Sequence, residues 1–267
     1  MQKITKTAEF IKQKIDIVPE IALILGSGLG SIADIIEDKQ IIDYKDIPDF
    51  PVSLVEGHKN RFVIGKISGK NVIAMQGRFH YYEGYSMQDI AMPIRVFKKL
   101  GVKSLLVTNA AGGLNPNFEV GNLMVINDHI NFMGDNPLMG KNFDELGPRF
   151  PAMTGAYNKV DFIREYAIEV NVPVVTGCYL ALTGPCYETP AEQRMYRNFA
   201  DAVGMSTVPE VITAKHCGYE NILGISLITN VHTGTSHLIP NHEEVVEAAE
   251  KAKPYFKKLV MKLIQKV

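Results

Sequence analysis

The chain has 267 residues, of which 46% are hydrophobic and 21% charged, which is typical of a folded globular protein and excludes disordered, collagen-like and coiled-coil chains. A chain of this length buries about 70–75% of its unfolded surface, and a single α/β domain over residues 1–267 is the simplest organisation. Lys and Arg together number 28, and Asp and Glu 29. The resulting net charge of −1 provides no overall positive field, so we expect no nucleic-acid partner.

The cysteine content and the apolar runs indicate whether the protein has disulfides, a metal site or a membrane helix. The chain has three cysteines, Cys178, Cys186 and Cys217. An odd number without the CxxC spacing fits neither a disulfide framework nor a zinc site. No uninterrupted apolar run approaches the roughly 18 residues that a membrane helix needs. We therefore expect a cytoplasmic protein with reduced thiols, no metal and no membrane partner.

The first half of the chain alternates between helical and strand patterns. Ile4, Ala8 and Ile11 recur at helical spacing and predict an N-terminal amphipathic helix. Residues 21–25 form a short apolar run typical of a strand buried on both faces. Residues 61–67 and 71–76 are two apolar segments joined by a Ser-Gly-Lys turn, and they predict a hairpin, which argues against a purely parallel sheet.

The second half continues the alternation. Further strands are predicted over residues 104–108, 123–126, 174–183 and 221–229, with helical patterns between most of them. Helix starts with capping boxes are predicted at Thr189, Thr207 and Asn241, and a long amphipathic helix closes the chain.

A glycine-rich turn, Gly-Ser-Gly-Leu-Gly at 26–30, follows the first strand and precedes a predicted helix. Its N–H groups can converge on an anion, and a phosphate or a dinucleotide are both possible ligands of such a turn. The dinucleotide fingerprint fails on spacing because Ser31 stands where its third glycine is needed. Phosphate binding is therefore favoured over dinucleotide binding.

The segment 76–85 follows a strand and gathers Arg78, His80, three tyrosines and a glutamate. Arg binds phosphate oxygens through two parallel hydrogen bonds, and His adds a donor whose charge is adjustable near neutral pH. The alternative interpretation is a solvated surface loop with aromatic anchors. Because ligand sites favour loops at strand ends, we favour a binding loop.

Four other segments have both a structural and a functional interpretation. Residues 109–113 are either a turn or a set of free N–H groups, and residues 204–207 resemble a second anion cradle. Glu188 either stabilises the dipole of the next helix or contacts a ligand. Asn230 is either a turn residue or an amide that reaches a ligand at the sheet edge. The histidines at 58, 80, 216 and 242 lack the spacing of a metal site.

Taken together, these segments resemble the trimeric, low-molecular-mass purine nucleoside phosphorylases over nearly the whole chain. The motifs that carry the resemblance appear in the order of that family: Gly-Ser-Gly-Leu-Gly at 26–30, Glu-Gly-His at 56–58, Gln-Gly-Arg-Phe-His-x-Tyr-Glu-Gly at 76–84, Thr-Asn-Ala-Ala-Gly-Gly at 108–113, Tyr-Glu-Thr at 187–189 and Gly-Met-Ser-Thr-Val-Pro-Glu at 204–210. The resemblance implies a single α/β domain with a mixed, partly barrel-like sheet flanked by helices, assembled as a homotrimer.

The resemblance also implies a reaction. A purine ribonucleoside and inorganic phosphate would give the free base and ribose 1-phosphate, reversibly and without a cofactor. It implies a preference for 6-oxopurines such as inosine and guanosine, because a carboxylate at Glu188 accepts from their N1–H but faces an acceptor in adenine. Family members of the mammalian type carry Lys after the asparagine and Phe before the glutamate, where this chain has Val231 and Tyr187.

The resemblance assigns roles to individual residues. Asn230, which would donate to N7 of the departing base, Glu188 and His80 are the expected catalytic residues. The other expected contacts are those to phosphate by Ser27, His58, Arg78, His80, the backbone at Ala110, and Ser206; to the base by Tyr187, Glu188 and Asn230; and to ribose by Tyr82, Met205, His242 and, from a neighbouring subunit, Phe150.

Three other functions are weighed against this one. A nucleoside hydrolase would use water, which needs neither the arginine nor the two anion cradles. A nucleoside-binding protein without turnover would not require Asn230 and Glu188 beside the phosphate residues. An oxidoreductase on a dinucleotide fold is disfavoured by the spacing of the glycine turn.

Overall fold

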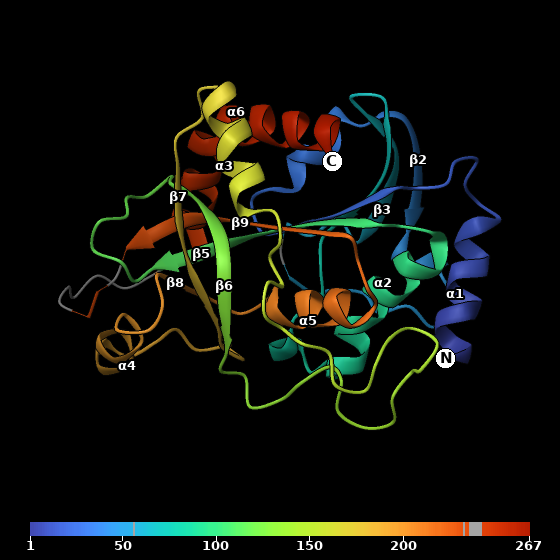
Figure 1. Cartoon of the computed structure of the whole chain (residues 1–267), viewed down its shortest axis with the longest axis horizontal. Coiled ribbons are helices and arrows are strands. Elements are labelled where there is room, and N and C mark those ends of the chain that lie inside the picture. The colour runs from blue at the N-terminus through green and yellow to red at the C-terminus, as the bar shows by residue number, and fades with distance from the viewer. Residues whose placement is uncertain (56, 232, 235–241) are drawn as a thin grey trace.

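The computed structural model describes residues 1–55, 57–231, 233–234 and 242–267, the last range without the side chains of residues 242 and 243. The described strands form one mixed nine-stranded sheet in the order β2-β3-β4-β1-β5-β8-β7-β6-β9 (Figure 1). Their bounds are β1 Ile21–Leu25, β2 Glu37–Asp43, β3 Arg61–Ile67, β4 Lys70–Gln76, β5 Ser104–Gly113, β6 Leu123–Asn131, β7 Val174–Ala181, β8 Ala202–Gly204 and β9 Asn221–Val231.

A further pairing turns part of this sheet into a ring. Strand β9 pairs antiparallel with β6 at the end of the order and parallel with β5 in its middle, so β5, β8, β7, β6 and β9 close on one another. Strands β3 and β4 form the predicted antiparallel hairpin, and β1 runs parallel to both β4 and β5. The mixed, partly barrel-like sheet expected from the resemblance is confirmed.

Helices cover the sheet on two sides (Figure 1). Helices α1, α2 and α5 lie together on one side, and α3 and α6 lie on the other, while α4 sits beside the ring. The bounds of the helices are α1 Gln2–Lys12, α2 Met87–Leu100, α3 Val160–Glu169, α4 Pro190–Tyr196, α5 Val208–His216 and α6 His242–Lys266, with 3-10 turns η1 Gly30–Ile35, η2 Tyr44–Asp46 and η3 Tyr81–Glu83.

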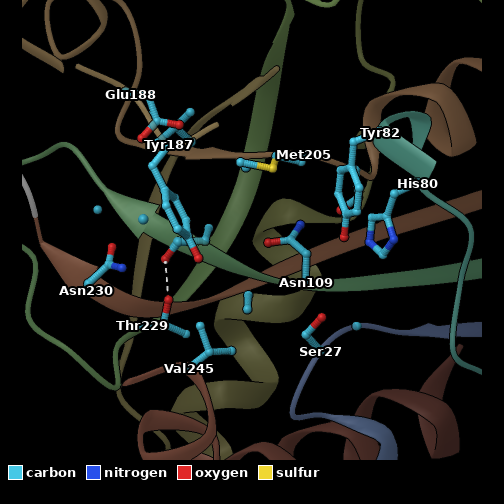
Figure 2. Close-up of a pocket in the computed structure, with 18 of the residues that line it drawn as sticks. Ser27, His80, Tyr82, Asn109, Tyr187, Glu188, Met205, Thr229, Asn230 and Val245 are labelled. Carbon is cyan, nitrogen blue, oxygen red and sulfur yellow. Dashed lines mark hydrogen bonds between the residues drawn. The ribbon is translucent and has the colours of Figure 1, made fainter. Parts of the chain in front are cut away.

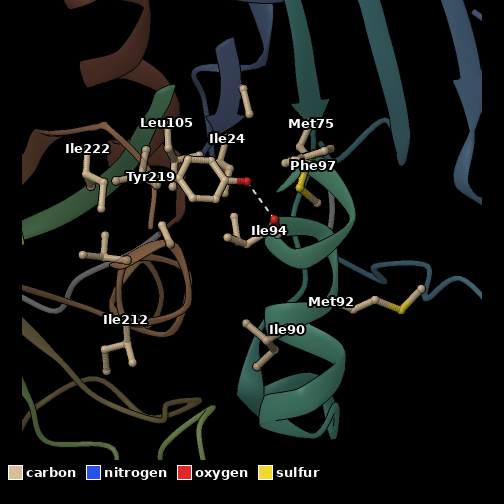
Figure 3. Packing of buried hydrophobic residues seen from close by; sticks show 14 of the residues in the cluster. Ile24, Met75, Ile90, Met92, Ile94, Phe97, Leu105, Ile212, Tyr219 and Ile222 are labelled. Carbon is tan, nitrogen blue, oxygen red and sulfur yellow. Dashed lines mark hydrogen bonds between the residues drawn. The ribbon is translucent and has the colours of Figure 1, made fainter. Parts of the chain in front are cut away.

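Each side of the sheet has its own apolar core. On the side of α2 and α5, Ile94 and Phe97 of α2 pack against the strands that carry Ile24 and Leu105 (Figure 3). Tyr219 is buried in the same cluster, and its hydroxyl donates to the carbonyl oxygen of Ile94 at 2.7 Å. Burial of each large apolar side chain contributes about 1.5–3 kcal/mol, so these two cores hold the strands that carry the site in place.

The helix predicted after the turn at 26–30 is present, as the 3-10 helix η1, and the Gly30 carbonyl oxygen accepts from Gln76 Nε2 at 2.8 Å. Two local predictions are wrong. Residues 109–113 are not a turn, because β5 continues to Gly113 along β9. Thr207 makes no side-chain cap for α5, because its hydroxyl accepts hydrogen bonds from two side chains of the site described below.

Candidate active site

One pocket, at the rim of the five-stranded ring, brings together most of the predicted site residues (Figure 2). Ser27, His80 and Tyr82 lie toward one end of it, and Asn230, Tyr187 and Glu188 toward the other. The predicted residues that line this pocket are Ser27, Arg78, His80, Tyr82, Ala110, Tyr187, Glu188, Met205, Ser206 and Asn230.

The glycine turn reaches the pocket through a close approach of Gly26 to strand β5. A Cβ atom added at Gly26 would lie 2.8 Å from Asn109 Cα and 2.8 Å from the Thr108 carbonyl oxygen. The Gly26 N–H donates to Thr108 Oγ1 at 3.3 Å, which holds the turn against β5. Because glycine alone fits there, the chain that leaves β1 can stay close to its parallel neighbour β5, and this places Ser27 at the pocket.

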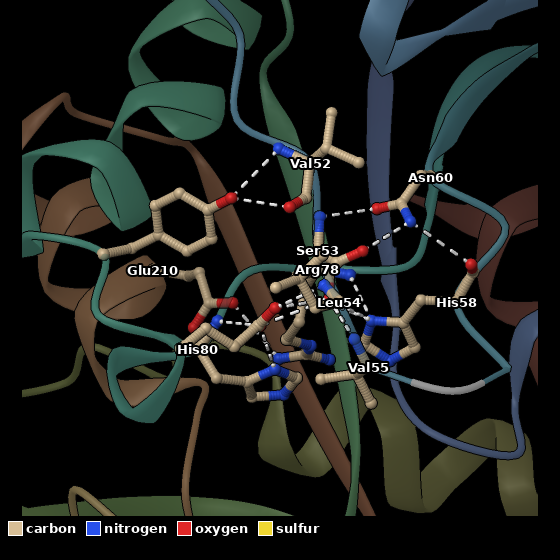
Figure 4. A network of polar contacts seen from close by, with 11 residues as sticks. Val52, Ser53, Leu54, Val55, His58, Asn60, Arg78, His80 and Glu210 are labelled. Carbon is tan, nitrogen blue, oxygen red and sulfur yellow. Dashed lines mark hydrogen bonds and ion pairs between the residues drawn. The ribbon is translucent and has the colours of Figure 1, made fainter.

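Arg78 is held by a buried ion pair that the sequence analysis did not anticipate (Figure 4). Its Nη1 lies 3.2 Å from Glu210 Oε1 and donates to Thr207 Oγ1, also at 3.2 Å, and its Nη2 donates to the carbonyl oxygen of Thr108. The side chains of Arg78 and Glu210 are 2% and 4% exposed. These contacts fix the guanidinium beside the pocket, where its positive charge favours an anion.

The backbone at Thr207 adopts an unusual conformation in support of this network. Its φ is 73°, in the left-handed region that a β-branched residue rarely occupies. In this conformation its hydroxyl accepts from Asn109 Nδ2 at 2.9 Å as well as from Arg78, and it lies 3.1 Å from Ser206 Oγ. The strained residue therefore links the arginine to the small polar residues at the start of α5.

His80 is oriented by Glu83, to which the sequence analysis gave no role. The His80 N–H donates to Glu83 Oε1 at 2.8 Å, and His80 Nδ1 lies 3.0 Å from the same oxygen. Burial opposes ionisation of Glu83, but hydrogen bonds from His80, Leu54 and Ser53 outweigh it and lower the pKa of the carboxyl. The carboxylate thus selects the Nδ1–H tautomer. The i, i+3 spacing of His80 and Glu83 is the sequence feature that could have predicted this contact.

His58 does not line the pocket and lies behind His80, with the two ring centroids 5.5 Å apart. Its Nδ1 lies 3.0 Å from the Arg78 carbonyl oxygen and 3.3 Å from the Arg78 amide nitrogen. Burial, together with the charges of His80 and Arg78, lowers the pKa of His58 to about 4. His58 is therefore neutral at pH 7 and supports the loop that carries Arg78.

The lowered pKa of His58 predicts acid sensitivity. The unfolded chain binds a proton at His58 below about pH 6.5, whereas the folded protein does so only near pH 4, so stability is lost as the pH falls between these values. We expect His58→Gln to reduce the stability difference between pH 7 and pH 4 by about 3 kcal/mol. Urea unfolding at both pH values measures this, and an unchanged difference would contradict it.

The opposite end of the pocket carries an amide and a carboxylate. Asn230, at the end of β9, is 9% exposed, and its side chain makes no hydrogen bond to the residues that the structure describes. A Cβ atom added at Gly112 would lie 3.0 Å from Asn230 Oδ1, so the neighbouring strand leaves room for this amide. Burial raises the pKa of Glu188, and Tyr187 beside it is half exposed.

Two predicted residues stay outside the pocket as described. Phe150 is 88% exposed and does not line it, and its role toward a neighbouring subunit stays a prediction. The side chain of His242 lies outside the described residues, although helix α6 begins at this position and Val245, one turn later, lines the pocket. Pocket residues that the sequence analysis missed include Asn109, Leu114, Gln193, Val203, Thr229 and Val245.

The pocket therefore offers a cation and several hydroxyl and N–H donors at one end and a paired amide and carboxylate at the other. Within the described part of the chain, no group of three or more His, Cys, Asp and Glu side chains is arranged to hold a metal ion. Nor does any helix in these described ranges combine the length and apolar character needed to cross a membrane. Such a pocket suits a ligand with an anionic part and a flat polar part.

Comparisons with known proteins agree with this arrangement. The family model described as the phosphorylase superfamily matches residues 20–265. Purine nucleoside phosphorylase 1 of Bacillus subtilis is 53% identical over 265 residues, covering 98% of this chain and 97% of the relative. The chain belongs to the purine nucleoside phosphorylase family. The mouse purine nucleoside phosphorylase is 46% identical over 273 residues, covering 98% of this chain and 93% of its own length.

Solved structures of purine nucleoside phosphorylases share the fold. Isoform 2 from Schistosoma mansoni, in complex with cytosine and ribose-1-phosphate, has a TM-score of 0.95 at 42% identity and covers all of this chain and 96% of its own. The purine nucleoside phosphorylase of the same organism with inosine has a TM-score of 0.93 at 43% identity, covering 100% of this chain and 97% of its own. The family and fold predicted from the sequence motifs are confirmed.

Proposed function

We propose that this protein catalyses reversible phosphorolysis of 6-oxopurine ribonucleosides, and their deoxy forms, to free base and (deoxy)ribose 1-phosphate in purine salvage. The observation that carries the proposal is a single pocket with Arg78 and His80 at one end and Glu188 and Asn230 at the other. The names of the relatives support it, as do the complexes of the Schistosoma enzymes with inosine, guanosine and ribose-1-phosphate.

The phosphate end would hold and orient the nucleophile. Arg78, Ser27, His80, Ser206 and the backbone at Ala110 supply a fixed cation and neutral donors around one position. A phosphate oxygen there would form a bond to the anomeric carbon of the sugar while the bond from that carbon to N9 of the purine breaks. The electron pair of the broken bond passes to the purine, and the phosphate charge stabilises the positive charge that develops on the sugar.

The base end would stabilise the leaving group. The amide of Asn230 is buried and unused by the described residues, so it can donate to N7 as negative charge builds on the purine ring. The Glu188 carboxylate would accept from N1–H of a 6-oxopurine. Tyr187 would pack on the base, while Tyr82, Met205 and His242 would contact the ribose. No cofactor enters the proposed reaction.

The decisive experiment is the release of hypoxanthine from inosine with and without inorganic phosphate. We expect release to require phosphate and to yield equal amounts of base and ribose 1-phosphate, with adenosine a poor substrate. Release without phosphate would identify a hydrolase, and saturable inosine binding without release would identify a binding protein.

Glu188→Gln tests the base-recognition role. A neutral amide presents a donor or a weaker acceptor to N1–H, and the loss of a charged hydrogen bond costs about 1.5–3 kcal/mol. We expect kcat/KM for inosine to fall about 10²-fold with little change in melting temperature. Steady-state kinetics and thermal unfolding measure the two effects.

Glu192→Gln is the matched control for Glu188→Gln. Glu192 is the exposed partner of Thr189 in the capping box of α4, and Gln is also accepted at that position of the box. This control variant should keep full activity. A loss of stability in Glu188→Gln that matches its loss of activity would instead support a role at the helix terminus.

The proposal extends to assembly and compartment. All described strands join one sheet, so we propose that residues 1–267 act as a single catalytic domain. The exposed ring of Phe150 supports a homotrimer in which it completes a neighbouring ribose site. The three free cysteines are in keeping with a cytoplasmic enzyme.

A further inference from the structure

A second cavity, separate from the candidate active site, lies between α1, α2 and the segment 139–143. Its volume is about 380 Å³, within the range of roughly 300–1,000 Å³ that is typical of small-molecule sites. It shares no lining residue with the candidate active site. Its apolar lining includes Ile4, Met92, Met139 and Phe143, and methionine side chains adapt to ligands of different shapes.

Hydrogen bonds from α2 fix one wall of this cavity. Gln88 Nε2 donates to the carbonyl oxygens of Pro137 at 3.0 Å and Met139 at 3.2 Å. Arg95 Nη2 donates to the Pro137 carbonyl oxygen at 2.8 Å, and its Nη1 donates to Gln88 Oε1 at 2.6 Å. The guanidinium carbon lies 4.9 Å from the centre of the Phe143 ring. These contacts hold the segment 137–143 on α2, so the shape of the cavity is built into the fold.

Arg95 gives this wall a buried positive charge without a negative partner. The residue is 2% exposed, it forms no ion pair with the described residues, and its Nε is buried without a hydrogen-bond partner among them. Burial lowers the pKa of Arg95, but a guanidinium keeps its proton at neutral pH. A buried charge without a counter-ion is costly. A neutral amide could hold Pro137 without this cost, so the charge favours an anionic occupant.

The other charged residues of the cavity leave positive charge in excess. Asp89 is the one carboxylate among the described lining residues, and it is engaged by Lys3 Nζ at 3.4 Å and by Ser86 Oγ at 2.6 Å. Lys141 is exposed. Three cations, Lys3, Arg95 and Lys141, therefore face one carboxylate that already has partners, which leaves a net charge of +2 around the cavity.

We propose that this cavity binds a small amphipathic monoanion, a carboxylate with an apolar body of about eight carbon atoms. The carboxylate lies toward Arg95 and Lys141, and the apolar body packs against Ile4, Met92 and Met139. The excess of positive charge selects the anionic group, and the apolar lining selects the body. The inference does not depend on the reaction proposed for the candidate active site, because the two sites share no residue.

Calorimetric titration with octanoate tests the inference, and octanamide is the neutral ligand of the same shape. We expect one octanoate to bind per chain, about tenfold more tightly than octanamide, because a hydrogen bond to a charged group is stronger than one between neutral groups. An excess of hypoxanthine should not displace octanoate, since the proposed function places hypoxanthine in the candidate active site.

Two variants test the cations separately. Arg95→Gln removes the buried charge and keeps an amide that can donate to Pro137, and it should lower the affinity for octanoate about tenfold without changing that for octanamide. Lys141→Glu reverses an exposed charge at the cavity and should lower the affinity for octanoate about fivefold. Lys12→Glu, an exposed residue at the other end of α1, is the matched control and should change neither affinity.

Each other outcome would overturn the inference. Equal affinities for octanoate and octanamide, or no saturable binding of octanoate, would show that the cavity does not recognise an anion. Unchanged octanoate affinity in Arg95→Gln or in Lys141→Glu would show that the cations serve the fold or the surface alone. Displacement by hypoxanthine would place octanoate in the candidate active site. If Arg95→Gln does not fold, Lys141→Glu and its control decide.

Discussion

Asn230→Ala is expected to lower kcat for inosine phosphorolysis by about 10²–10³-fold while phosphate binding is unchanged. The amide is placed where negative charge develops on the departing base, and removal of one such positioned donor costs about 2.7–4 kcal/mol of transition-state stabilisation. Its contribution to ground-state binding is smaller, so the effect falls on kcat more than on KM. Steady-state kinetics and calorimetric titration with phosphate measure the two quantities.

The control for Asn230→Ala lies on the same strand. Asn221 begins β9, far along the strand from the pocket, and its Nδ2 donates to Ser104 Oγ at 2.8 Å. Asn221→Ala removes a hydrogen-bonded asparagine without touching the pocket, so we expect kcat to be unchanged. Full activity in Asn230→Ala would refute its role toward the base, and weakened phosphate binding would point to a displaced strand β5.

Arg78→Met is expected to abolish phosphate-dependent turnover and to destabilise the fold by about 3–5 kcal/mol. The large stability effect arises because Glu210, 4% exposed, would be left as a buried carboxylate without its partner. The loss of activity arises separately, from removal of the cation that the phosphate would contact. Urea unfolding and calorimetric titration with phosphate measure the two losses.

A double variant separates these two effects. In Arg78→Met with Glu210→Met, both buried charges are gone, and replacing a buried ion pair by apolar groups is often neutral for stability. We therefore expect the double variant to recover most of the lost stability and none of the activity. Recovery of phosphate binding in the double variant would show that Arg78 serves the fold alone.

The parts of the fold that could be predicted from the sequence are those fixed by neighbours in the chain. The first strand, the hairpin at 61–76 and the capped start of α4 follow from apolar period, turn residues and capping chemistry, all of which act within a few residues. The closed ring of strands could not be derived in this way. It depends on the pairing of β5 with β9, more than a hundred residues apart, and entered only through the family resemblance.

The same distinction, between features fixed by neighbours in the chain and those that depend on distant contacts, applies to the candidate site. Arg78 and His80 were predicted because they follow a strand in a motif of the family, and Asn230 because it follows the strand predicted over residues 221–229. Glu210 was predicted only as part of a helix start, since its partner Arg78 is 132 residues away and the contact exists only in the folded chain. The burial of Gln193 could not be predicted either, because a glutamine in a short helix with a capped start is by itself typical of a solvated surface.

The two glycines that end β5 limit how far this protein can be stabilised by redesign. Glycine within a strand costs about 0.5–1 kcal/mol relative to alanine, so a procedure that optimises stability would replace Gly112 and Gly113. A methyl group at Gly112 would lie 3.0 Å from Asn230 Oδ1, and one at Gly113 would lie 3.0 Å from Ile228 Cγ2. An alanine at Gly112 would therefore require the Asn230 amide to shift by a few tenths of an ångström, so a substitution that stabilises the strand at this position would do so at the expense of the residue placed to act on the base.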